Sequence, residues 1–112
     1  MPRIFVSSVI PAPVEKVWER VRDFNALPDW VPMVAESHIK DGMLPDQVGC
    51  IREFSLQNGD RITEQLVALS DYDMSVSYTM LMTPMALENY FATLRLTPVT
   101  ETKETFVEWS AE

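Results

Sequence analysis

Two charged residues stand on the apolar face of a predicted β-hairpin, in the stretch GCIREFSLQNGDRITEQL at residues 49–66. Alternate residues of a strand point to opposite faces, which places Arg52 and Glu64 among the apolar members of their strands. The three-residue loop Gln57-Asn58-Gly59, whose glycine tolerates positive φ, sets Arg52 directly opposite Glu64. Two opposite charges are therefore expected to meet inside an apolar surface.

Two tyrosines are predicted to share this inner face. Turns centred on Asp71 and Pro84 set Glu64 opposite Tyr78, and Tyr78 opposite Tyr90. The same alternation assigns a largely apolar set of residues to the inner face, among them Val48, Cys50, Phe54, Ala68, Val76, Met80, Met82 and Leu94. An arginine, a glutamate and two tyrosines should thus converge within an apolar lining.

This convergence has a structural interpretation and a functional one. A structural salt bridge would give little net stability, because the cost of desolvating both charges roughly offsets their attraction. We favour a ligand site, since a small domain gains little else from burying such a pair. The candidate catalytic residues are Arg52, Glu64 and Tyr90. The predicted ligand-binding residues are Arg52, Phe54, Glu64, Tyr78, Met80, Tyr90 and Leu94.

Three classes of function fit these residues. In a binding protein, Arg52 would hold the oxygen-bearing end of a small hydrophobic molecule whose remainder is enclosed by apolar side chains. In a cofactor-independent cyclase, dehydratase or isomerase, Glu64 would move a proton while Tyr90 stabilises a developing oxyanion. In a protein-interaction module, the groove would receive a helix of another chain.

Composition narrows the possible partners and location. Seventeen acidic against nine basic residues give a formal net charge of −8, which argues against nucleic acid and against an anionic membrane surface. The single cysteine, Cys50, excludes an internal disulfide and favours a reducing cytoplasm. The one histidine, His38, is predicted to be an exposed strand residue, and no cluster has metal-ligand spacing. We expect neither a metal nor another cofactor.

The hydrophobic pattern predicts one α+β domain spanning residues 1–112. A helix should begin after Pro13 and end near Phe24, followed by a short helical turn at 26–30 that Asn25 caps. Period-two patterns predict strands at about 3–10, 34–40, 48–56, 61–69, 74–82, 87–97 and 103–110. The result would be a curved antiparallel sheet with one wet and one dry face.

The motifs resemble those of the polyketide cyclase/dehydrase and lipid-transport family, a START-like (SRPBCC) group. The similar stretches are PAPVEKVWERVRDFNALPDWVP, GCIREF, TEQLVALSD, YTM, ENYFATLRLTPV and FVEWSAE, which cover nearly the whole chain. The resemblance implies the helix-grip fold, in which a seven-stranded antiparallel sheet closes over a long C-terminal helix and encloses an apolar ligand cavity.

Two branches of that superfamily look most similar. In lachrymatory-factor synthases, an arginine, a glutamate and a tyrosine are associated with rearranging a small sulfenic acid, and Arg52, Glu64 and Tyr90 match those positions. Abscisic-acid receptors hold a ligand carboxylate with a charged residue, and Asn89-Tyr90 resembles their sequence near the matching point. The resemblance therefore implies a pocket and leaves both catalysis and binding open.

One departure from the family pattern concerns the long helix. The family continues into that helix after its V-E-W strand, whereas this sequence stops at Glu112. We therefore expect a truncated domain whose dry face is exposed near Met80, Leu94 and Trp109. An apolar patch of that size favours association, so a second copy of the chain is the predicted cover.

Overall fold

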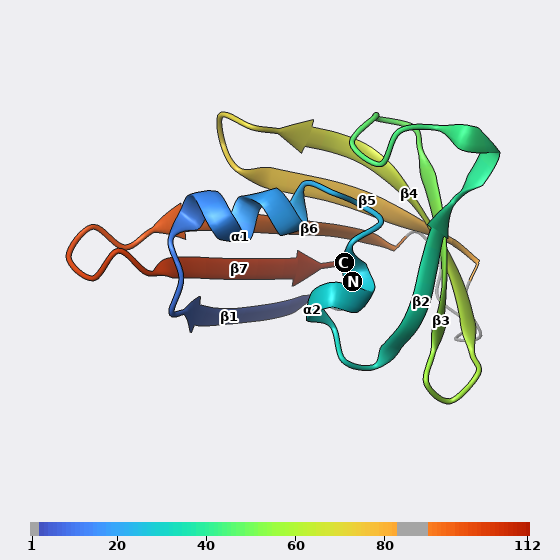
Figure 1. Ribbon diagram of the computed structural model, residues 1–112, viewed down its shortest axis with the longest axis horizontal. Coiled ribbons are helices and arrows are strands. Elements are labelled where there is room, and N and C mark those ends of the chain that lie inside the picture. The colour runs from blue at the N-terminus through green and yellow to red at the C-terminus, as the bar shows by residue number, and fades with distance from the viewer. Residues whose placement is uncertain (1–2, 83–89) are drawn as a thin grey trace.

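The computed structural model describes residues 3–82 and 90–112, which form a curved seven-stranded antiparallel sheet (Figure 1). The strand order is β1-β7-β6-β5-β4-β3-β2. The strands are β1 (Ile4–Ile10), β2 (Val34–Ile39), β3 (Ile51–Leu56), β4 (Arg61–Ser70), β5 (Ser75–Met82), β6 (Phe91–Pro98) and β7 (Thr105–Ala111). The helices are α1 (Val14–Val21) and α2 (Leu27–Trp30), with a 3₁₀ turn at Lys40–Gly42. The α+β, helix-grip-like sheet is confirmed, and β7 is the last element of the described chain.

Helix α1 forms because its apolar residues recur at helical spacing. Val14, Trp18 and Val21 fall on one side of the helix and are buried, whereas Glu15 in the first turn and Arg20 in the last complement the helix dipole. The helix lies across the sheet over β6 (Figure 1). It therefore covers part of the inner face.

The expected capping of the second helix by Asn25 is wrong. The N-cap of α2 is Ala26, and no side chain bonds to its first turn. The Asn25 side-chain oxygen instead accepts a 2.9 Å hydrogen bond from the Ser37 hydroxyl, which ties the segment to β2. Tertiary contacts, including those of α2 with β2, thus place this four-residue helix.

A polar cluster fastens α1 to the turn between β4 and β5. The indole nitrogen of Trp18 donates to Asp71 at 2.7 Å, and Arg22 Nε donates to the same carboxylate oxygen at 2.9 Å. Arg22 also donates to Asp46 at 3.0 Å. The hydrogen bonds from Arg22 and Trp18 lower the pKa of Asp71 below its ordinary value. These contacts fix where the helix lies over the sheet.

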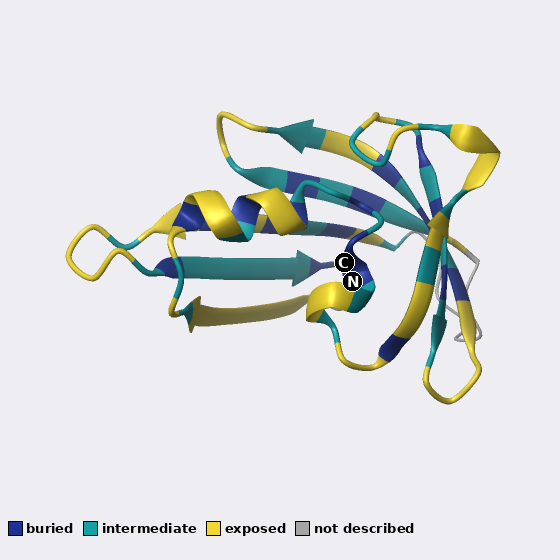
Figure 2. Cartoon of the chain, viewed as in Figure 1, coloured by how far each residue is buried: buried dark blue, intermediate teal, exposed yellow. Residues whose placement is uncertain are grey.

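The two faces of the sheet differ in burial as the alternation predicts (Figure 2). Arg52 and Glu64 are 6% and 4% exposed, among the apolar residues of the inner face. His38 lies on the outer face, where its ring Nε2 is 3.1 Å from Glu53 and its side chain is mostly exposed. The inner face carries the core, which one group of residues forms beneath α1 and a smaller group beneath α2.

Register confirms one predicted pairing and corrects two. Arg52 lies opposite Glu64, as expected. Glu64, however, pairs with Met80, and Tyr78 lies opposite Leu66 on one side and Ala92 on the other. Each correction is a displacement by two residues, and an even displacement keeps a side chain on its face. The predicted turn at Pro84 lies outside the described residues.

Two irregularities interrupt the β4–β5 pairing, and one of them explains an inverted stretch of β4. The register shifts between Thr63 and Glu64 and again between Leu66 and Ala68. Ala68, predicted to face inward, is exposed, whereas Leu69 packs against the core. A β-bulge has this effect, because the extra residue reverses the alternation beyond it. Val48 is exposed as well, because β3 begins only at Ile51.

The inner face was predicted to be exposed near Leu94, and this prediction is wrong. Leu94 is 3% exposed and belongs to the core that α1 covers. Exposed apolar side chains lie instead on the edge strand β1, where Ile4 and Val6 are 63% and 55% exposed. These two residues pair with Ala111 and Trp109 of β7. That a second copy of the chain covers the exposed apolar surface remains a prediction.

The reversed alternation in β4 can be tested with two lysine substitutions. We expect Ala68→Lys to change the free energy of unfolding by no more than about 0.5 kcal/mol, because the side chain enters water. Leu69→Lys should cost at least about 2 kcal/mol, because it removes a core contact and places a charge there. Urea unfolding followed by tryptophan fluorescence would measure both. If Ala68→Lys were the more destabilising of the two, the alternation of β4 would continue without a bulge and Ala68 would face inward.

Candidate ligand-binding site

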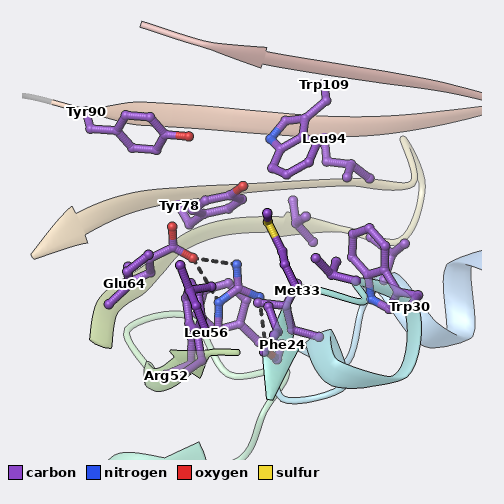
Figure 3. A pocket seen from close by; sticks show the side chains of 17 residues that line it. Phe24, Trp30, Met33, Arg52, Leu56, Glu64, Tyr78, Tyr90, Leu94 and Trp109 are labelled. Carbon is purple, nitrogen blue, oxygen red and sulfur yellow. Dashed lines mark hydrogen bonds and ion pairs between the residues drawn. The ribbon is translucent and has the colours of Figure 1, made fainter. Parts of the chain in front are cut away.

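The buried ion pair joins the central strands β3 and β4. Arg52 Nε and Nη2 donate to Glu64 Oε1 at 3.0 and 2.6 Å. Both bonds end on the same carboxylate oxygen. The second oxygen of Glu64 takes no hydrogen bond from the described residues, and Figure 3 shows it directed toward the space beneath Tyr78 and Tyr90.

The guanidinium makes further contacts with the protein. Arg52 Nη1 donates to the backbone carbonyl of Phe24 at 3.1 Å, and the guanidinium carbon lies 3.8 Å from the centre of the Phe24 ring. The rings of Tyr78 and Phe54 lie 5.0 and 5.4 Å from it. Aromatic faces stabilise a desolvated cation, so these three rings help to hold Arg52 in the apolar interior.

Burial shifts the titration of the acidic groups around this pair. It raises the pKa of Glu64, although the positive charge and hydrogen bonds of Arg52 oppose that shift. Burial also raises the pKa values of Tyr78 and Tyr90, with a further contribution from the charge of Glu64. Both tyrosines are therefore neutral hydroxyls near neutral pH.

These groups border a cavity of about 340 Å³ between the inner face, α2 and the segment that follows α2 (Figure 3). Six of the seven predicted ligand-binding residues line it: Arg52, Phe54, Glu64, Tyr78, Tyr90 and Leu94. The seventh, Met80, does not line it and packs against the core group beneath α2. Their predicted roles in binding or catalysis remain predictions.

The sequence interpretation missed the wall opposite the sheet. That wall includes Phe24, Leu27, Trp30, Val31 and Met33. The helical spacing of Leu27, Trp30 and Val31 was a signal for it, whereas nothing local marked Met33. Trp109, named only as a member of the dry face, also borders the cavity. Its indole nitrogen is buried and makes no well-formed hydrogen bond in the described parts of the chain, although it faces the Tyr78 hydroxyl and lowers the pKa of that hydroxyl slightly against the larger effect of burial.

Cys50 lies on the inner face and is fully buried. Burial raises the pKa of its thiol, which the nearby positive charge of Arg52 only partly opposes. A thiol that is both neutral and inaccessible is a poor nucleophile. Cys50 therefore acts as a small apolar core residue.

Within residues 3–82 and 90–112, no group of three or more His, Cys, Asp and Glu side chains is arranged to hold a metal ion. In the same residues, no helix is both long and apolar enough to cross a lipid bilayer.

The chain belongs to the polyketide cyclase/dehydrase and lipid-transport family, whose model matches residues 1–112. Its fold resembles solved structures of longer proteins. A Nitrosospira multiformis protein is 33% identical, with a TM-score of 0.88 over 99% of this chain and 77% of the other. XoxI from Bacillus cereus is 30% identical, with a TM-score of 0.88 over 100% and 75%. An uncharacterized Bacillus thuringiensis protein is 29% identical, with a TM-score of 0.88 over 99% and 77%.

Separating the partners of the buried pair should be more damaging than removing both. We expect Arg52→Met to lower the free energy of unfolding by about 3–5 kcal/mol, because Glu64 is left buried and unpaired. The double variant Arg52→Met/Glu64→Leu should recover most of that loss. Urea unfolding would compare them.

The exposed pair Arg20–Asp29 supplies the control, with its charged atoms 2.7 Å apart. Arg20→Met should cost less than about 1 kcal/mol. Equal losses in the single and double Arg52 variants would show that lost packing, and not the unpaired charge, determines the cost.

Proposed function

We propose that this protein binds a small hydrophobic molecule with one oxygen-bearing end in the cavity beneath α2. Membership in a family of cyclases, dehydrases and lipid-transport proteins supports this class of function. The observation that carries the proposal is the division of the cavity wall. Apolar side chains form most of it, whereas Glu64, Tyr78, Tyr90 and Trp109 gather their polar atoms at one end.

Such a cavity favours a ligand of matching polarity. Its volume of about 340 Å³ lies in the range of small-molecule sites, in which apolar walls supply affinity and a few polar groups fix orientation. Phe54, Leu56 and Leu94 would enclose the apolar body. The oxygen-bearing end would then lie against the tyrosines and Glu64.

A charge placed in the apolar wall should weaken binding. N-phenyl-1-naphthylamine, an uncharged fluorophore, serves as the probe in a fluorescence titration. We expect Leu56→Glu to raise its Kd about tenfold or more, because the apolar ring would face a carboxylate. Leu44→Glu is the matched control, because Leu44 is 64% exposed and lies away from the cavity. Equal affinity in the two variants would place the probe elsewhere and contradict the assignment.

Catalysis by the same site is the second candidate, which one observation favours. The carboxylate oxygen of Glu64 that Arg52 does not bind is directed toward the cavity, beside two hydroxyl groups (Figure 3). A desolvated carboxylate with a raised pKa is suited to accept a proton from a carbon acid, and a tyrosine hydroxyl can stabilise the resulting enolate. No cofactor would take part in this step.

The catalytic candidate predicts proton exchange on an apolar ketone. With 2-tetralone in D₂O, the protein should accelerate exchange of the acidic α-protons, measured by NMR. Glu64→Gln should reduce the rate to that of buffer while 2-tetralone still binds, because an amide is not a base at this pH. Binding of 2-tetralone without acceleration by the unaltered protein would leave binding as the function and contradict catalysis.

A further inference from the structure

The groups still available to a ligand differ from those that the charges alone suggest. Arg52 lines the cavity, but each of its three nitrogens already donates one hydrogen bond, to Glu64 Oε1 or to the carbonyl of Phe24, which uses three of its five N–H groups. The Phe24 ring, 3.8 Å away, covers one face of the guanidinium. A ligand oxygen could accept only from the two N–H groups that remain, on a cation that Glu64 and Phe24 already hold in place. Arg52 is better described as a positioning residue for Glu64.

The acceptor that remains open is the second carboxylate oxygen of Glu64. It receives no hydrogen bond from the described residues and is directed toward the cavity (Figure 3). An ionised carboxylate accepts hydrogen bonds and donates none, so its complement is a ligand O–H or N–H. Hydrogen bonds to a charged acceptor are also stronger than neutral ones.

The indole nitrogen of Trp109 is a further donor at this end of the cavity, since an indole N–H can only donate. It is buried and makes no well-formed hydrogen bond within the described residues, although it faces the Tyr78 hydroxyl closely enough to oppose the rise in the pKa of that hydroxyl. In Figure 3 it lies on the same side of the cavity as the hydroxyls of Tyr78 and Tyr90. A phenol both donates and accepts, so the tyrosines adapt to the ligand. The polar end of the cavity thus offers a charged acceptor, a donor and two adaptable hydroxyls.

We propose that the polar end of the ligand is an uncharged hydroxyl group, which donates to Glu64 and accepts from Trp109 or a tyrosine, and that carboxylates are rejected. This inference rests on the proposed binding function and specifies its ligand. A ligand carboxylate would lie beside the acceptor oxygen of Glu64, and two such anions in a dry cavity repel each other. It could enter only with uptake of a proton.

Three naphthalenes of similar size separate these possibilities. At pH 7, 2-naphthol donates and accepts, 2-methoxynaphthalene only accepts, and 2-naphthoate is an anion. Each would displace N-phenyl-1-naphthylamine from the unaltered protein in a fluorescence titration. We expect 2-naphthol to displace it at concentrations about tenfold or more below those of the other two, as loss of a hydrogen bond to a charged group implies.

A single substitution should abolish the preference for a hydroxyl group. In Glu64→Gln, the amide oxygen can keep the hydrogen bonds of Arg52 while the amide nitrogen presents a donor to the cavity. We expect the advantage of 2-naphthol over 2-methoxynaphthalene to disappear and 2-naphthoate to bind more tightly than before. Glu53→Gln is the matched control, because Glu53 lies on the outer face beside His38. It should leave the order of the three compounds unchanged.

The possible outcomes distinguish this inference from the function on which it rests. Displacement by 2-naphthoate at or below the concentration of 2-naphthol would overturn the inference and assign the ligand oxygen to Arg52. Equal displacement by all three compounds would also overturn it while leaving the binding function intact. If the probe itself failed to bind, both proposals would fall. Because the ligand series uses the unaltered protein, it decides the question even if Glu64→Gln does not fold.

Discussion

The ion pair between Arg52 and Glu64 is the constraint on which the candidate site depends. It links adjacent strands and, through the carbonyl of Phe24, the segment that leaves α1. A buried pair of this kind adds little net stability, because desolvation opposes the attraction of the charges. Its effect is geometric. With Arg52 fixed by three hydrogen bonds and an aromatic face, the carboxylate of Glu64 has one held oxygen and one directed inward.

The polarity of the cavity follows from that asymmetry. A fork in which each nitrogen met its own carboxylate oxygen would satisfy both oxygens and leave little for a ligand. Here both bonds from Arg52 to Glu64 end on Oε1, so the pair is neutral as a whole but presents an acceptor to the cavity. The raised pKa values of Tyr78 and Tyr90 keep two neutral hydroxyls nearby. The polar end of the cavity is thus formed by groups that the fold itself holds in place.

The sequence predicted the sheet, and it placed Arg52, Glu64 and the two tyrosines on one face of it. Both predictions depend on alternation with a period of two, which a register displacement of two residues leaves unchanged. The pairing of Arg52 with Glu64 followed from the short loop at Gly59, whose φ of +94° suits glycine. The bulge that exposes Ala68 carries no comparable local signal. Met33 belongs to the cavity wall through the tertiary position of the segment after α2, and the choice of one carboxylate oxygen is a matter of atomic geometry that spacing does not encode.

The strand order also constrains how this chain folds. From β2 to β7, every pairing joins strands that follow one another along the chain, so these hairpins can form in sequence. Among the strands of the described residues, β1 lies at the edge and pairs with β7 alone, where Ile4 meets Ala111. Contacts between such distant segments carry a large loop-closure entropy and slow the search for the native state. During synthesis, the apolar strand β1 must therefore wait until β7 has also left the ribosome, and it is exposed to misassociation throughout that interval.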